Sequence, residues 1–231
     1  MLRSIINYGC LAVCLISTSV QAQQGPGIRA GLDLSKLVRS ELQEGYRGAE
    51  LFGDLSFKKG SRIAIELGNE RFRTKEEIGQ SVLYQYSVSG SYLKVGLDWD
   101  IYAQKKGEKN QITAGVRYAL SQFTTDIGQA FFYDTQAVQT NGNFPLYTDN
   151  GPTLNSLKAQ YLEGVLSFKT HLVGNFYIGG SFRMAFLTGE QSPENFDNLW
   201  VPGFNKVTDG ARFGFSYNYG ISYFIPLKKD K

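Results

Sequence analysis

The chain has 231 residues, a length that suits one domain or one domain with a short extra segment. Its 26 glycines, 6 prolines, 14 tyrosines and 16 phenylalanines are typical of many strands joined by tight turns, and argue against a helical bundle. The formal net charge of +3 is small. No basic stripe interleaved with aromatic residues is present, which argues against a nucleic-acid-binding protein.

Residues 1–22 predict a secretory signal peptide. Arg3 supplies a positive charge, residues 5–16 are mostly apolar, and residues 17–22 are mostly small and end in Val20-Gln21-Ala22, which fits cleavage before Gln23. The apolar stretch is too short for a transmembrane anchor and has no basic stop-transfer flank. We therefore expect one β-barrel domain over residues 23–231.

Both cysteines, Cys10 and Cys14, lie inside this segment, so the mature chain is expected to contain no disulfide and no reactive thiol. The alternative is that one of them is a lipoprotein cysteine. Against it, Cys14 follows Val13, a poor residue at that position, and Cys10 comes early in the apolar region.

After the signal, no run approaches the ~20 consecutive apolar residues that a membrane-spanning helix needs. Apolar and polar residues instead alternate with a period of two, the pattern of a β-strand with two different faces. Eight segments show it: residues 28–34, 49–57, 63–67, 93–101, 112–120, 162–168, 176–186 and 213–225. An even number of strands is what single-chain bacterial membrane barrels have.

The last of these segments shows the pattern most clearly. Phe215, Tyr217 and Tyr219 share one face, and Ser216 and Asn218 share the other. Its length matches the ~9–11 residues that a tilted strand needs to cross a bilayer. These features predict an all-β fold, an eight-stranded antiparallel up-and-down transmembrane β-barrel.

The connections between the segments alternate in length. Residues 58–60, 105–110 and 172–175 form short connections, whereas longer ones begin at Arg71 and cover residues 124–155 and 188–210. Membrane barrels have short periplasmic turns and long external loops, so the pattern sets an orientation. Only the first external connection, residues 39–45, is expected to be short.

The two faces of the predicted strands differ in charge. The outward face carries no charge in its central part, and Lys36 is expected at its rim, where a long side chain can reach water. The inward face is predicted to hold seven cations and seven carboxylates: Arg29, Arg62, Lys94, Arg117, Lys169, Arg183 and Arg212, and Asp33, Glu50, Asp54, Glu66, Asp98, Asp100 and Glu163. Because side chains fill the interior of so small a barrel and buried charges need partners, we interpret them as a packed polar core that plugs the lumen; an ion path is the alternative.

Little in the sequence suggests catalysis. The one histidine, His171, is expected beside a short turn, at the opposite end from the outer leaflet where a barrel enzyme would act. Asp98 and Asp100 share a face, but neighbouring cations explain them. We expect no enzymatic activity, no cofactor and no metal site.

The external loops offer the best candidates for contact with a partner. They contain large apolar residues that are unusual on exposed loops: Phe131, Phe132, Tyr133, Phe196, Trp200 and Phe204. Two interpretations stay open. The residues pack together as a cap over the barrel mouth, or they form a surface for a protein, a glycan or a neighbouring lipid.

The segments 27–34 and 92–98 and the aromatic last strand resemble the small outer-membrane barrels of the Bacteroidetes. The resemblance covers essentially the whole mature chain and implies an eight-stranded barrel of the OmpA/OmpX type, with no known activity. It leads us to expect a monomeric protein of the outer membrane, with membrane lipid and the assembly machinery as partners. A lipid-modifying barrel enzyme and a soluble, lipocalin-like periplasmic barrel are the alternatives.

Overall fold

The computed structural model describes residues 26–58, 60–78, 81–102, 110–133, 146–150, 153–191, 198–207 and 212–227. The signal peptide expected at residues 1–22 lies outside this part of the chain.

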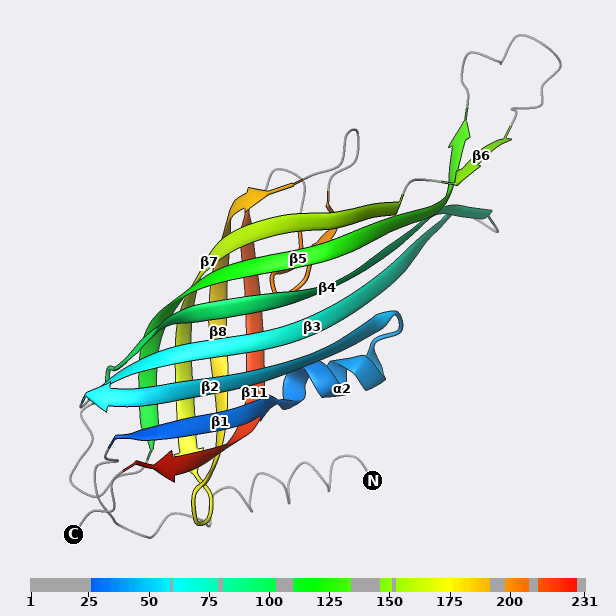
Figure 1. Ribbon diagram of the computed structural model, residues 1–231. Coiled ribbons are helices and arrows are strands. Elements are labelled where there is room, and N and C mark those ends of the chain that lie inside the picture. Colours follow the sequence, from blue (N-terminus) through cyan, green and yellow to red (C-terminus); the bar gives the residue numbers. More distant parts are fainter. Residues whose placement is uncertain are drawn as a thin grey trace, which may run out of the picture.

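Eight strands form a closed antiparallel barrel (Figure 1). The sheet order is β4-β3-β2-β1-β11-β8-β7-β5, and pairing of β4 with β5 closes it. The strands are β1 (Gly27–Asp33), β2 (Tyr46–Lys58), β3 (Ser61–Ile78), β4 (Ser81–Asp100), β5 (Gln111–Tyr133), β7 (Thr153–His171), β8 (Phe176–Glu190) and β11 (Phe213–Pro226). This confirms the predicted eight-stranded antiparallel barrel, because each of the eight alternating segments falls in its own strand, except for Leu34 and Ile101 at the ends of two segments.

Three short strands lie outside the barrel wall. The strand β6 (Leu146–Asn150) pairs with the last residues of β5, and β9 (Trp200–Val201) pairs with β10 (Asn205–Lys206) in a small hairpin. We call the end of the barrel that holds Gly27, Pro226 and the short connections the terminal end, and the opposite one the far end.

Several wall strands are longer than the sequence analysis predicts. The longer connections expected from Arg71 and over residues 124–155 are partly strand, because β3, β4 and β5 continue their pairing well past the apolar segments. Figure 1 shows this sheet projecting beyond the rest of the barrel at the far end. The prediction stopped short because the outward residues there become polar, although backbone hydrogen bonding continues.

The connection between β1 and β2, predicted to be a short external loop, contains the helix α2 (Leu34–Leu42). The side chain of Asp33 caps its N-terminus by accepting a hydrogen bond from the backbone N–H of Ser35 at 2.7 Å. Because β1 ends at Asp33 while β2 and β11 continue, the helix lies where the next part of β1 would lie (Figure 1).

Among the described residues, no helix combines the length and the apolar character needed to cross a membrane.

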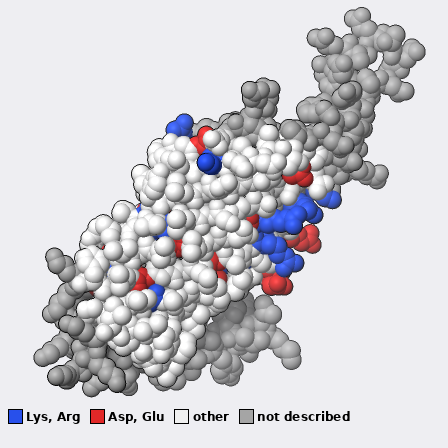
Figure 2. Space-filling model, in the orientation of Figure 1, with Lys and Arg blue, Asp and Glu red and all other residues white. Residues whose placement is uncertain are grey.

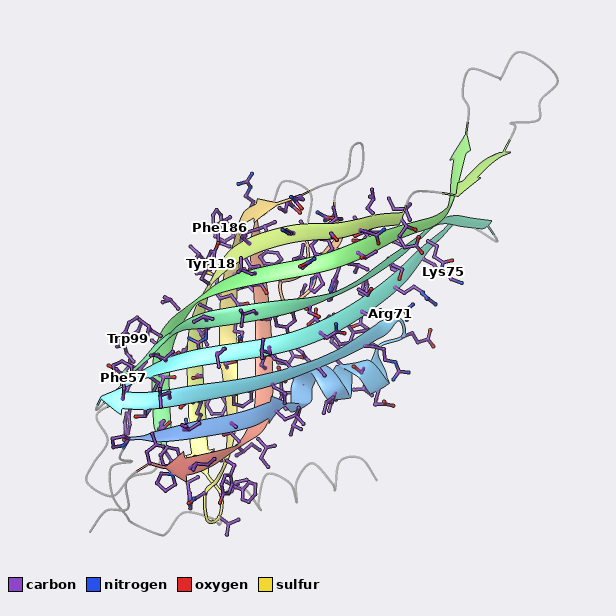
Figure 3. All side chains as sticks on the ribbon, in the orientation of Figure 1. Phe57, Arg71, Lys75, Trp99, Tyr118 and Phe186 are labelled. Atoms are coloured by element: carbon purple, nitrogen blue, oxygen red, sulfur yellow. The ribbon has the colours of Figure 1, made fainter. Side chains whose placement is uncertain are left out.

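The outward face of the barrel carries an apolar band with a polar border. At the border, the cross-strand row Leu51, Leu67, Leu93 and Leu120 is followed two residues later by the row Ala49, Asn69, Ser91 and Gln122. Figure 2 shows few charges over most of this face, with charged groups gathered near the far end of β3. Outward-pointing Phe57 and Trp99 lie near the terminal end, and Arg71 and Lys75 lie toward the far end (Figure 3).

Candidate functional site

The interior of the barrel holds a layer of charged side chains toward its terminal end, which we call the charged layer. Its buried members come from the inward positions of β1 to β8: Arg29, Asp33, Glu50, Asp54, Arg62, Glu66, Lys94, Asp98, Arg117, Glu163 and Arg183. Period-two alternation brings them to one side of the wall, and closure of the barrel brings the strands together.

Strand register places opposite charges face to face in this layer. Arg29 is the cross-strand partner of Asp54, Arg62 of Asp98, Glu66 of Lys94, and Arg117 of Glu163. Cross-strand neighbours of opposite charge stabilise a sheet, whereas like charges would repel. The register of the strands alone therefore places opposite charges side by side, whichever hydrogen bonds the side chains then form.

The side chains nearest the terminal end meet around Asp54. One oxygen of this carboxylate accepts hydrogen bonds from Nη1 of Arg29 at 3.1 Å and from Nζ of Lys169 at 2.8 Å. Nearby, Arg62 makes a two-pronged contact with Asp100, at 2.7 and 3.0 Å. Lys169 and Asp100 are partly accessible at the edge of the layer, whereas Asp54 is buried.

The middle of the layer is organised around Glu66. Its Oε1 accepts from Nε of Arg117 at 3.0 Å, and its Oε2 accepts from Nη1 of Arg183 at 2.5 Å. Arg117 also grips Asp98 through two hydrogen bonds of 2.8 and 3.0 Å, and Arg183 reaches Glu163 at 3.2 Å. Each of these five buried charges thus has partners of opposite sign, the condition that makes burial tolerable.

Two charged residues that the sequence analysis did not assign to the interior belong there. Lys36 was expected outside at the rim, but it is only 8% exposed, and its Nζ donates to Oε1 of Glu70 at 2.5 Å. The prediction is wrong because residues 34–42 are helical, which turns Lys36 inward. Glu70 was missed because the third segment was ended at residue 67, although the period of two continues through residue 70.

Glu70 links the charged layer to residues that lie closer to the far end of the barrel. Besides Lys36, its carboxylate accepts from the hydroxyl group of Tyr46 at 3.0 Å, from the backbone N–H of Gly203 at 3.0 Å and from the indole N–H of Trp200 at 3.4 Å. One buried carboxylate on β3 thereby holds α2, the start of β2 and the distant β9–β10 hairpin together.

Toward the far end the interior changes to an apolar cluster, which we call the aromatic layer. It comprises Tyr46, Tyr86, Val88, Ala119, Phe123, Ala159, Tyr161, Ala185, Leu187, Trp200, Val201 and Phe204. The β9–β10 hairpin supplies its last members. Trp200 stacks on Phe72 with ring centroids 4.3 Å apart, and Phe204 meets the edge of Tyr161 at 5.4 Å.

This layer corrects the predicted loop contacts. Trp200 is 3% exposed and Phe204 is 2% exposed, so neither belongs to an exposed partner surface. Both pack inside the barrel mouth, the other interpretation that the sequence left open. Phe196 lies outside the described residues, and so do the side chains of three further candidates, namely Phe131, Phe132 and Tyr133.

The remaining predicted positions are less central. Arg212 is exposed at the start of β11, and the prediction that it faces the interior is wrong because it precedes the strand. Asp33 is buried, but it bonds Ser35 and the side-chain amide of Asn218. His171 bonds the backbone carbonyl of Gly174 at 2.8 Å, beside the short turn where it was expected.

Little free space is left within the charged layer. A cavity of about 60 Å³ lies among residues that include Glu50, Glu66 and Arg117. In the part of the chain that the structure describes, no group of three or more histidine, cysteine or carboxylate side chains is arranged to hold a metal ion. The arrangement therefore offers paired charges and packing.

Comparison with known proteins adds the family. No curated protein matches the chain. The crystal structure of a major outer membrane protein from Thermus thermophilus is similar over 87% of this chain and 98% of its own, with 10% identity and a TM-score of 0.45. That of CarO from Acinetobacter baumannii is similar over 86% and 96%, with 9% identity and a TM-score of 0.36. The family described as "Domain of unknown function (DUF6048)" matches residues 12–230, and the chain belongs to that family.

Proposed function

We propose that this protein is a non-enzymatic barrel of a bacterial outer membrane, of the OmpA/OmpX type found in Bacteroidetes, with its terminal end in the periplasm. The observation that carries this proposal is the reversed polarity of the barrel: its charges face inward and its apolar residues face outward. A soluble lipocalin-like barrel would need the opposite arrangement. A wall with a large apolar outer surface is unfavourable in water but favourable in a lipid bilayer.

A closed lumen is the second part of the proposal. Ions would have to cross the charged layer, where Glu66, Arg117 and Arg183 are already bonded to one another, and then the aromatic layer. Both layers are packed with side chains. We infer a structural or surface-interaction role in place of transport.

The surface role is assigned to the projecting far end of the sheet. Beyond the apolar band, β3 turns the exposed side chains of Arg71, Arg73 and Lys75 outward (Figure 3). A row of cations just outside the band is suited to the anionic head groups of the outer leaflet or to an acidic glycan. The proposed partners are therefore membrane lipid and a surface glycan or protein, with the barrel itself a monomer.

The membrane location is tested by two matched substitutions on β4. Val95→Arg places a cation inside the apolar band, and Ser89→Arg places one beyond it on the same outward face. Because arginine costs about 2–4 kcal/mol at the bilayer midplane and little near the interface, Val95→Arg should impair folding into phospholipid vesicles and Ser89→Arg should not. Equal effects of the two variants, or recovery of the native protein in a salt-washed soluble fraction, would contradict the proposal.

The closed lumen and the surface role need separate measurements. Planar bilayers containing the folded barrel should show no stable single-channel currents, and regular currents would refute closure. For the surface role, deletion of the gene should alter the detergent sensitivity of the cells. The native chain should restore that sensitivity, and the chain carrying Arg71→Glu, Arg73→Glu and Lys75→Glu should not. Full restoration by that variant would count against the cationic row.

A further inference from the structure

The barrel wall is not closed by strand pairing all the way to the far end. Residues 213–219 of β11 pair with β8 on one side, and no described strand pairs with their other side. The helix α2 fills this position but is fastened to β2, where the Ser40 hydroxyl group accepts from the backbone N–H of Gly48 at 2.8 Å. Of the residues that the structure describes, none in α2 donates or accepts a hydrogen bond with β11. We call this place the α2–β11 gap.

A cavity of about 500 Å³ lies in the α2–β11 gap. Its lining includes Phe215 and Tyr217, which point outward and are 77% and 71% exposed, together with the buried Trp200 and Lys94. The cavity therefore joins the outer surface of the wall to the interior. Its volume lies within the ~300–1,000 Å³ that is usual for small-molecule sites.

The charges that line the cavity have one sign. Lys36, Arg39, Lys94 and Lys206 contribute to it, and no aspartate or glutamate does. Lys36 and Lys94 are neutralised by Glu70 and Glu163. In the described structure neither Arg39 nor Lys206 forms an ion pair, so these two cations give the cavity a net positive charge.

Arg39 is held ready for an anion. Its guanidinium donates to the amide oxygens of Gln43 at 2.6 Å and Asn205 at 2.9 Å, and lies over the rings of Tyr46 and Trp200 at 4.2 and 4.9 Å. Neutral oxygens and aromatic faces orient a guanidinium without cancelling its charge. The group is therefore fixed in place at the inner side of the gap.

We propose that the α2–β11 gap binds a long-chain amphiphile with an anionic head group. The head group binds at Arg39 and Lys206, and the hydrocarbon chain runs out past Phe215 and Tyr217 into the lipid. The proposal rests on the membrane location proposed above. An unpaired strand edge at membrane depth must be met by polar groups, because lipid cannot satisfy backbone N–H and C=O groups. An anionic head group entering from the side can accept hydrogen bonds from the N–H groups of this edge, while its chain stays in an apolar surrounding.

The test uses Trp200 as a reporter, because it lines the cavity. The only other tryptophan, Trp99, faces outward near the terminal end, and Trp99→Phe removes its signal. The full barrel is folded into phosphatidylcholine vesicles and titrated with 2-bromohexadecanoate, whose bromine lies beside the carboxylate and quenches indole at short range. We expect saturable quenching that unbrominated hexadecanoate reverses. The methyl ester should quench little, and butyrate should not compete.

Two variants locate the site. Arg39→Gln keeps hydrogen-bond donors but removes the charge, and should raise the half-saturating concentration about tenfold. Arg212→Gln removes an exposed cation outside the cavity and should leave it unchanged. Ser216→Phe narrows the cavity from β11 and should reduce the quenching at saturation, in a barrel whose gel migration before heating shows that it is folded.

The outcomes separate this proposal from the membrane location. Flotation with the vesicles, together with quenching of Trp99 by brominated phosphatidylcholine in a chain carrying Trp200→Phe, shows insertion regardless of ligand. If the barrel inserts and 2-bromohexadecanoate quenches Trp200 without saturation, or equally in Arg39→Gln, the amphiphile site is refuted and the location stands. If the barrel does not float, the location fails and the site fails with it.

Discussion

The charged layer and the aromatic layer fill the same barrel by different means. In the charged layer, wall strands alone supply the side chains, and cross-strand register sets opposite charges beside each other. The aromatic layer is completed by the β9–β10 hairpin, which folds back from the connection between β8 and β11. One layer thus depends on pairing within the sheet, and the other on a segment that returns into it. We expect removal of a buried charge from the charged layer to lower the free energy of unfolding more than removal of an aromatic ring from the aromatic layer.

The largest effect is expected from Glu66→Leu. Two buried guanidinium groups, those of Arg117 and Arg183, would each lose a carboxylate. Removing one partner from such a buried ion-pair network should lower the free energy of unfolding by about 3–5 kcal/mol. The loss is measured by urea titration of the barrel in vesicles. Glu41→Leu removes an exposed carboxylate that pairs with exposed Arg47, and should cost less than ~0.5 kcal/mol. Equal losses would mean that the charged layer is not a stabilising network.

A smaller loss is expected in the aromatic layer. Phe204→Ala removes a buried ring that packs on Tyr161 and should lower the free energy of unfolding by about 3 kcal/mol, because it leaves a cavity. Phe213→Ala is the matched control, since its ring points outward and is 59% exposed, so its loss leaves no cavity in the interior. If Phe213→Ala proves the more costly, the hairpin is not packed as a core element.

Removing a contact between the two layers should lower the free energy of unfolding less than the changes within either layer. Tyr46→Phe removes only the hydroxyl group that donates to Glu70 and should cost about 1 kcal/mol, the usual net value of one hydrogen bond. In the control Tyr118→Phe, an exposed hydroxyl group bonded to Gln160 is lost and should cost less, because neither group belongs to the packed interior. A loss above that of Phe204→Ala would show that Glu70 controls both layers.

The smallest effect is expected at Arg212, outside both layers. Arg212→Gln should change the free energy of unfolding by less than ~0.5 kcal/mol in the same urea titration, as exposed positions without buried contacts usually do. A loss comparable to that of Glu66→Leu would return Arg212 to the interior, where the alternation alone had placed it.

These comparisons show how far alternation carries. An alternation with a period of two indicates which residues share a face of a strand. The eight strands and most of the interior charges could therefore be found from the sequence. The alternation does not state where a strand ends. The pattern at Arg62, Glu66 and Glu70 continues without a break, and Glu70 was missed only because the outward residues beside it had turned polar.

The helix α2 had a signal of its own. Asp33 is a good N-cap, and Leu34, Leu37, Val38 and Leu42 recur at helical spacing. That signal competed with a short continuation of the strand alternation, which put Lys36 outside. Helix formation reverses its direction, and the ion pair with Glu70 then holds it inside.

The sequence by itself determined the strand count and the polarity of the two faces, because side-chain alternation is a local property of an extended chain. Only the tertiary structure decided that the β9–β10 hairpin lies within the barrel, that Trp200 and Phe204 are buried, and that α2 leaves a gap beside β11. Those features arise from contacts between segments far apart in the chain. No local pattern records the space that closing the barrel leaves for them.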